Sequence, residues 1–296
     1  MSVAALNKVE MTPKDYKSEV PPVWCPGCGH FGILNGLYRA LSELGVDPDN
    51  LVITSGIGCS SRTPYFVDSY KMHTLHGRAG AVATGTQLAN PDLAVMTVGG
   101  DGDGFSIGGG HMPHMARKNI NMTYILFDNG IYGLTKGQYS PTSRPELKAY
   151  TTPYGGPEEP MNPLLYMLTY KATYVAQAFA GKPRICAELI KQGIAHKGFS
   201  FINIYSQCPT FNLIDTIQYY RDLVYEVPED HDPSNRGAAI ELARRKETGP
   251  TAGKVPMGLI YQKEAPTLCD KMQEFVDNVG GTPDYDLNKI IDLSRP

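Results

Sequence analysis

Acidic and amide side chains follow two apolar runs of the chain at a spacing that suits a metal site. "LAVMTVGGDGDG" contains Asp101 between Gly100 and Gly102, and "MTYILFDNG" ends just after Asn129. Asp101 and Asn129 are 28 positions apart, about the length of one strand–helix–strand unit. Because parallel strands end at the same edge of a sheet, both side chains are predicted to meet there. Their oxygens suit Mg²⁺, which prefers to share its oxygen ligands with phosphate groups.

The glycines around Asp101 predict a diphosphate site, because they let backbone N–H groups approach and the following helix N-terminus favours an anion. Nucleotide-binding alternatives fail: neither Gly100 nor Gly102 begins a G-x-G-x-x-G pattern, and no G-K-[ST] follows. G-D-G with Asn at this spacing resembles the signature of thiamine-diphosphate enzymes. In that signature a backbone carbonyl two residues after the Asn completes the Mg²⁺ ligands, which implies Asp101, Asn129 and Ile131.

Six cysteines offer a second kind of chemistry. The segment "WCPGC" around Cys25 and Cys28 differs from a thioredoxin dithiol only in its middle residues. Thioredoxin's pair follows a buried strand, however, and the prolines of "SEVPP" cannot supply one here. A compact zinc ribbon would need a second C-x₂-C roughly 15–20 residues further on. The next cysteine is Cys59, so that module is excluded.

Cys59 and Cys208 each follow a predicted strand, so both are expected to meet the Cys25–Cys28 loop at the edge that carries Asp101. Four thiolates suit Zn²⁺ or an iron–sulfur cluster, and spacing alone does not decide between them. A position beside a thiamine site favours an electron acceptor over a structural zinc. Cys186, within "RICAELIKQGI", is predicted to pack in the core.

Alternating strands and helices are predicted to position these residues. Apolar residues recur at spacings of three and four from His30 to Leu44, which predicts a helix closed by Gly45. Further helices are predicted in "GGGHMPHMARKN" and "RICAELIKQGI". Strands are predicted in "LVITS", "LAVMTVGG", "MTYILFD", "ATYVAQAFA" and "FSFINIY". This alternation predicts an α/β fold with a doubly wound parallel sheet.

Three regions are predicted along the chain: an N-terminal arm (1–22), an α/β domain (23–210) and an irregular C-terminal extension (211–296). Prolines oppose regular structure in the arm. Residues 141–163 carry six prolines and are predicted to form a long loop over the surface or against a partner. The extension is predicted to pack on the core or a partner subunit, and "PMGLIYQK" is its clearest strand candidate.

Composition narrows the class of protein. The 296 residues are 42% hydrophobic and 19% charged, which is typical of a soluble globular protein. A net charge of -3 gives no electrostatic reason to expect a nucleic-acid partner. No segment approaches the roughly 18 apolar residues of a membrane span, and the N-terminus is not typical of a secretory signal. We therefore expect a cytoplasmic location, where paired cysteines bind metal or act catalytically.

Six motifs, in order, are similar to those of the β subunit of 2-oxoacid:ferredoxin oxidoreductases, particularly the 2-oxoglutarate type: "WCPGCGHFGIL", "SGIGCSSR", "HTLHGRA", "GGDGDGFSIGGGH", "DNGIYGLTKGQ" and "CPTFN". The likeness covers residues 18–215 and extends into the tail. It implies a thiamine-diphosphate-binding (PP domain) fold and a [4Fe–4S] cluster on Cys25, Cys28, Cys59 and Cys208. It further implies thiamine-diphosphate contacts from Ile57, Gly58, Cys59, Ser60, His76, Gly102, Asp103, Gly133 and Leu134.

The resemblance also implies a reaction. Arg62 would bind the substrate carboxylate, His76 would lie near the reacting carbon and Lys136 would contact coenzyme A. The implied reaction is CoA-dependent oxidative decarboxylation, most simply of 2-oxoglutarate to succinyl-CoA, with one-electron transfers to the cluster. The reverse direction would fix CO₂. Three alternatives stay open: pyruvate or a broad range of 2-oxo acids, a non-redox thiamine decarboxylase, and a metal-binding assembly subunit with structural zinc.

The resemblance implies partners as well. Thiamine enzymes need a glutamate from a separate pyrimidine-binding domain, and only one α/β unit of this type is predicted here. The family places that glutamate in an α subunit. An (αβ)₂ assembly is therefore expected, with ferredoxin as its transient electron acceptor.

Overall fold

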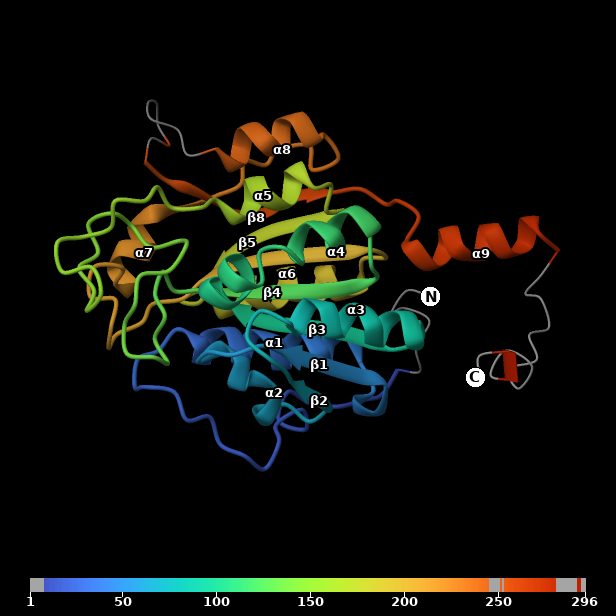
Figure 1. Ribbon diagram of the computed structural model, residues 1–296. Coiled ribbons are helices and arrows are strands. Elements are labelled where there is room, and N and C mark those ends of the chain that lie inside the picture. The colour runs from blue at the N-terminus through green and yellow to red at the C-terminus, as the bar shows by residue number, and fades with distance from the viewer. Residues whose placement is uncertain (1–7, 245–250, 252, 281–291, 294–296) are drawn as a thin grey trace.

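An eight-stranded sheet runs through the molecule in the order β2-β1-β3-β4-β6-β5-β8-β7 (Figure 1). The computed structural model describes residues 8–244, 251, 253–280 and 292–293, and every structural statement below refers to these. The strands are β1 (Leu51–Ser55), β2 (Tyr70–His73), β3 (Ala94–Gly100), β4 (Met122–Asp128), β5 (Tyr174–Phe179), β6 (Phe199–Tyr205), β7 (Val224–Glu226) and β8 (Val255–Gln262).

Six neighbouring strands of the sheet, in the order β2-β1-β3-β4-β6-β5, are parallel, which confirms the predicted sheet type. In their register Gly100 of β3 lies opposite Phe127 of β4, and Asp128 of β4 lies opposite Tyr205 of β6. The carboxyl ends of these strands therefore share one edge, as ligand-binding α/β sheets require. Residues 211–296 contribute β8, which pairs antiparallel with β5, and β7, which pairs parallel with β8.

Helices cover both faces of the sheet (Figure 1). One core cluster packs α1 (His30–Leu44) and α6 (Pro183–Ala195) against one face of the sheet. A second cluster packs four helices against the other face: α3 (Ala79–Ala89), α4 (Met112–Lys118), α5 (Pro163–Thr169) and α8 (Arg236–Ala243). The central strands are buried along their whole length, which explains their near-continuous apolar sequences. The other helices are α2 (Thr63–Phe66), α7 (Ile217–Leu223) and α9 (Leu268–Asn278), with short turns η2 (Pro48–Asn50), η3 (Ser60–Arg62) and η4 (Asp103–Ile107).

The described part of the N-terminal arm, residues 8–22, packs on the core without a helix or regular strand. Its anchor is Tyr16, which is fully buried and donates a hydrogen bond to the Val46 carbonyl at 2.6 Å. Residues 1–7, and in the extension 245–250, 252, 281–291 and 294–296, lie outside the described residues. The division into arm, domain and extension therefore stays a prediction.

The helix α9 extends away from the body of the molecule (Figure 1). A capping box on Thr267 and Asp270 begins it, but none of its residues is buried. Among the described residues, no helix combines the length and apolar character needed to cross a membrane.

Candidate cofactor and cluster site

The carboxylate of Asp101 is held at one oxygen and free at the other. Its Oδ2 accepts hydrogen bonds from Ser140 Oγ and from Thr142 Oγ1, the latter at 2.8 Å. Its Oδ1 is buried and has no hydrogen-bond partner. Burial raises the pKa of this carboxyl, and the hydrogen bonds from the two hydroxyls oppose the rise. A buried acceptor without a donor is costly, so an arriving cation would satisfy an oxygen that the protein leaves open.

The predicted partners of Asp101 lie beside it in the turn after β4. The backbone N–H of Asn129 lies close enough to lower the pKa of Asp101, and the Asn129 side-chain oxygen accepts from the Ile131 amide at 3.2 Å. Asn212, in the extension, donates to the Asn129 carbonyl at 3.0 Å. Gly130 between the two predicted ligands has a φ of 61°, a left-handed conformation that favours glycine. The structure thus brings together the three residues of the predicted Mg²⁺ set.

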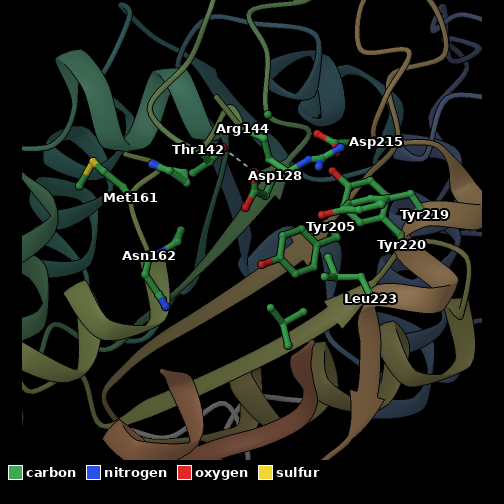
Figure 2. Close-up of a pocket in the computed structure, with 14 residues that line it drawn as sticks. Asp128, Thr142, Arg144, Met161, Asn162, Tyr205, Asp215, Tyr219, Tyr220 and Leu223 are labelled. Carbon is green, nitrogen blue, oxygen red and sulfur yellow. Dashed lines mark hydrogen bonds and ion pairs between the residues drawn. The ribbon is translucent and has the colours of Figure 1, made fainter. Parts of the chain in front are cut away.

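A second carboxyl stands directly behind Asp101. Thr142 Oγ1 is 2.8 Å from Asp128 Oδ1 as well as 2.8 Å from Asp101 Oδ2 (Figure 2 marks the contact with Asp128). Burial and, less strongly, the nearby charge of Asp101 together raise the pKa of Asp128 to about 8. Since a hydroxyl has only one proton, Thr142 cannot donate to both acids. A proton on Asp128 would supply the second hydrogen bond, with Asp101 as the ionised acid.

Asp103 ties three separate loops together. Its Oδ1 accepts from the Ile57 amide at 2.9 Å, from the Gly77 amide at 2.7 Å, and contacts His76 Nδ1 at 2.7 Å. The loop at Gly56 passes so close that a Cβ there would lie 2.1 Å from Asp103 Oδ2. Because Nδ1 of His76 is engaged, Nε2 is the ring nitrogen left for other chemistry. Asp103 therefore orients His76.

Backbone from three loops forms the rest of the proposed cradle. Gly102 directly precedes η4, a π-helical turn, and a Cβ on it would lie 2.2 Å from the Tyr132 ring. Gly58 has a φ of 149°, and the neighbouring Ser60 is buried with its Oγ facing Gly100. Irregular π-helical turns occur frequently at functional sites. The loops after β1, β3 and β4 thus meet at one edge with little side-chain bulk between them.

The four predicted cluster cysteines also converge at this edge. A Cβ placed on Gly133 would lie 3.6 Å from Cys59 Sγ and 3.7 Å from Cys208 Sγ. The thiol of Cys28 lies close enough to those of Cys25, Cys59 and Cys208 for each to influence its pKa. Hydrogen bonds also join the loops that carry these cysteines. Trp24 Nε1 donates to the Cys59 carbonyl at 2.6 Å. The Gln207 carbonyl accepts from the Gly29 amide at 3.1 Å, and the Gln207 side chain donates to the Gly27 carbonyl at 3.0 Å.

The surroundings of these four thiols bear on which metal ion or cluster they could bind. Burial, with smaller effects from the other three thiols, raises the pKa of Cys28 to about 12, so thiolates here need a strong positive charge nearby. In the described part of the chain, no three His, Cys, Asp or Glu side chains are grouped around a single ion position. Four thiols that meet at one edge suit either a tetrahedral Zn²⁺ or an iron–sulfur cluster.

Three other predicted residues surround the site less closely. Arg62 ends η3, is half-buried, and lowers the pKa of the Cys59 thiol, which burial otherwise raises. No ion pair among the described residues involves Arg62. Lys136 is exposed in a turn with a φ of 78°, and Leu134 beside it is 40% exposed. Among the described residues, no side-chain hydrogen bond or ion pair joins Lys136 to His76 or Arg62, so its role stays a prediction.

Sequence reasoning missed the residues that support the metal loops. Thr142 lies in residues 141–163, which were predicted to cover the surface or a partner, and Ser140 directly precedes them, yet both contact Asp101. Asn212 lies in the predicted extension and supports Asn129. Serine, threonine and asparagine in proline-rich segments are ordinary loop residues, so no local signal marks them.

Comparisons with known proteins agree with this arrangement. Residues 56–204 match the family described as thiamine pyrophosphate enzyme, C-terminal TPP binding domain. Residues 208–277 match the C-terminal part of the pyruvate ferredoxin oxidoreductase beta subunit. The fold and site therefore define the cofactor-binding domain of a thiamine pyrophosphate enzyme.

Individual relatives narrow this class. The chain is 42% identical over 267 residues to subunit beta of 2-oxoacid:ferredoxin oxidoreductase 2 from Aeropyrum pernix, covering 90% of this chain and 80% of the relative. It is 38% identical over 266 residues to the 2-oxoglutarate synthase subunit KorB of Methanothermobacter thermautotrophicus, covering 90% and 91%. A solved structure, 2-oxoglutarate:ferredoxin oxidoreductase from Magnetococcus marinus with 2-oxoglutarate, coenzyme A and succinyl-CoA bound, superposes with a TM-score of 0.91 at 71% identity, covering 98% of each chain. The chain belongs to the family of β subunits of 2-oxoacid:ferredoxin oxidoreductases, which are oxidoreductase enzymes.

Proposed function

We propose that this chain, with an α subunit, forms a 2-oxoglutarate:ferredoxin oxidoreductase that holds thiamine diphosphate, Mg²⁺ and one [4Fe–4S] cluster. The observation that carries the proposal is the meeting of four thiols with Asp101 and Asn129 at one sheet edge. Such an arrangement would put an electron acceptor beside a metal-bound diphosphate.

The magnesium ligands in this proposal are Asp101, Asn129 and the Ile131 carbonyl. The open Oδ1 of Asp101 supports the assignment, because it is an anionic oxygen without a protein donor. The loops after β1, β3 and β4 would contact the diphosphate and ring system through Ile57, Gly58, Cys59, Ser60, His76, Gly102, Asp103, Gly133 and Leu134.

The cluster ligands are Cys25, Cys28, Cys59 and Cys208. The convergence of the four thiols beside the proposed cofactor loops supports an electron-accepting cluster over a structural zinc. Cys25 is exposed and Cys208 is buried, so Cys25 would face the solvent side and Cys208 the protein interior.

When bound, thiamine diphosphate supplies carbanion chemistry at the 2-oxo carbon and the cluster supplies an exit for electrons. The chain's own residues would bind and orient. Arg62, a cation without a carboxylate partner in the described chain, would bind the distal carboxylate of 2-oxoglutarate through its planar fork. His76 would present Nε2 to the substrate, because Asp103 holds Nδ1. Lys136 would bind coenzyme A.

The remaining requirements fall to partners. An α subunit would provide the pyrimidine-domain glutamate in an (αβ)₂ assembly, and ferredoxin would collect the electrons in the cytoplasm. The relatives carry the names of beta subunits, which supports an α partner. The reverse reaction, reductive carboxylation, uses the same groups.

Anaerobic assays of the co-expressed α and β subunits test the proposal. We expect CoA-dependent ferredoxin reduction with 2-oxoglutarate, at a kcat/KM about 10- to 100-fold above that with pyruvate, from a charge-assisted contact of ~1.5–3 kcal/mol. Arg62→Gln should remove most of this preference. A preference for pyruvate would contradict the substrate assignment, and loaded enzyme without CoA-dependent reduction would contradict the reaction.

A further inference from the structure

Thr142 contacts the proposed magnesium ligand on the side away from the ion. Its Oγ1 lies 2.8 Å from Asp101 Oδ2, and Ser140 Oγ donates to that same oxygen. Asp101 Oδ1 receives no hydrogen bond. Both hydroxyls thus bind one carboxylate oxygen and leave the other for a ligand.

We propose that Thr142 is a positioning residue, whose hydroxyl holds the Asp101 carboxylate in the rotation that presents Oδ1 to magnesium. The inference rests on the proposed function, since it requires Asp101 to be a Mg²⁺ ligand. Mg²⁺ demands near-ideal octahedral geometry at ~2.0–2.1 Å, whereas Ca²⁺ accepts flexible geometry at ~2.3–2.6 Å. A carboxylate that can rotate should therefore lose Mg²⁺ more than Ca²⁺.

Hydrogen bonding, more than packing, holds this side chain. Thr142 lines a cavity of about 160 Å³ that Asp128, Arg144 and Tyr220 also line (Figure 2). Thr142 thus stands between Asp101 and open space. Because few atoms press on it from the cavity side, its two oxygen contacts to Asp101 and Asp128 fix its position.

The turn that carries Thr142 has its own anchors. Ser143 Oγ donates to the Gly130 carbonyl at 2.6 Å and accepts from the Ser140 amide at 2.8 Å. Arg144 Nε donates to Asp215 Oδ1 at 2.7 Å. None of these bonds uses the Thr142 hydroxyl, so its removal should leave the turn in place.

The test measures cofactor binding in the assembled αβ enzyme. Equilibrium dialysis with thiamine diphosphate gives the Mg²⁺ and Ca²⁺ concentrations for half-maximal retention in wild type, Thr142→Val and Thr142→Ser. Thr142→Val keeps the shape and removes the hydroxyl, and we expect it to need about 10- to 100-fold more Mg²⁺. The Ca²⁺ requirement should rise less. Thr142→Ser should return the Mg²⁺ requirement to near the wild-type value.

Two further variants make the result decisive. Thr169→Val removes an exposed hydroxyl that donates only to the Leu165 carbonyl, and it should not change the Mg²⁺ requirement. An unchanged Mg²⁺ requirement in Thr142→Val, an equal loss of both ions, or no recovery in Thr142→Ser overturns the inference. If Asp101→Asn loses the cofactor while Thr142→Val does not, only this inference fails. If Asp101→Asn retains it at wild-type Mg²⁺, the magnesium assignment fails as well.

Discussion

Asp103 was predicted to contact the cofactor, and its main visible role is to join loops. Its carboxylate accepts from the Ile57 and Gly77 amides and holds His76. Asp103→Ala would leave the buried Gly77 amide and the part-buried Ile57 amide without an acceptor, at up to ~1–3 kcal/mol each. We expect Asp103→Ala to lower the free energy of unfolding by about 3 kcal/mol in urea titrations. Asp103→Asn, which keeps an acceptor, should cost about 1 kcal/mol. Equal losses would argue against this role.

Gly102 is required by close approach, since its φ of -66° is open to any residue. A Cβ would lie 2.2 Å from the Tyr132 ring, whose hydroxyl donates to the Gly102 carbonyl at 3.1 Å. We expect Gly102→Ala to destabilise the chain by about 1–3 kcal/mol through overpacking. Gly110→Ala is the matched control, because a Cβ there meets nothing within 4 Å. Thermal unfolding of both variants distinguishes a steric cause from a general cost of losing glycine.

At the scale of elements, α9 should be the least stable helix of the free chain. Its 11 residues bury none of their side chains, and Met272 and Phe275 are 53% and 72% exposed. Isolated helices of this length are marginal in water, and most helical stability comes from packing. We expect amide hydrogen exchange in α9 to be much faster than in α1 of the free subunit. Equal protection in the free subunit would contradict this account.

The sequence predicted those elements whose pattern is local. The helix from His30 to Leu44 and its closure at Gly45, which has a φ of 66°, were confirmed. The strand Tyr70–His73 was missed, because all four residues are exposed and carry no apolar run. The antiparallel direction of β8 was not predictable either, since the side-chain pattern of a strand is the same in both directions.

In the candidate site, too, the sequence predicted some residues and not others. Asp101 and Asn129 could be paired from sequence, because consecutive parallel strands must end at one edge. The same reasoning brought Cys59 and Cys208 to the Cys25–Cys28 loop. Thr142 could not be found, because its contact with Asp101 depends on how a proline-rich loop folds back across the sheet edge. Such tertiary contacts leave no periodic trace in the chain.

For the whole molecule, acid should weaken the fold in part through a buried histidine. His196 is 7% exposed, its Nε2 is 2.9 Å from Thr173 Oγ1, and burial lowers its pKa to about 4 from 6.5. Between pH 4 and pH 6.5 this histidine is protonated in the unfolded chain and neutral in the folded one. The free energy of unfolding therefore falls as the pH drops below about 6.5, by at most ~1.4 kcal/mol per pH unit. Urea unfolding of the metal-free chain at pH 7.5 and 5.5 should show a smaller loss in His196→Gln. Identical losses would exclude this residue as a cause.

In the proposed αβ enzyme, electrons would pass from a 2-oxo acid at the Asp101 side of the edge to a cluster on the four cysteines. Electron paramagnetic resonance of the anaerobic αβ enzyme, loaded with thiamine diphosphate, Mg²⁺ and iron, measures this transfer directly. Adding 2-oxoglutarate and coenzyme A without an external acceptor should produce the signal of a reduced [4Fe–4S] cluster, and Cys208→Ser should lose that signal. A fully loaded enzyme whose spectrum does not change on adding 2-oxoglutarate would contradict the account.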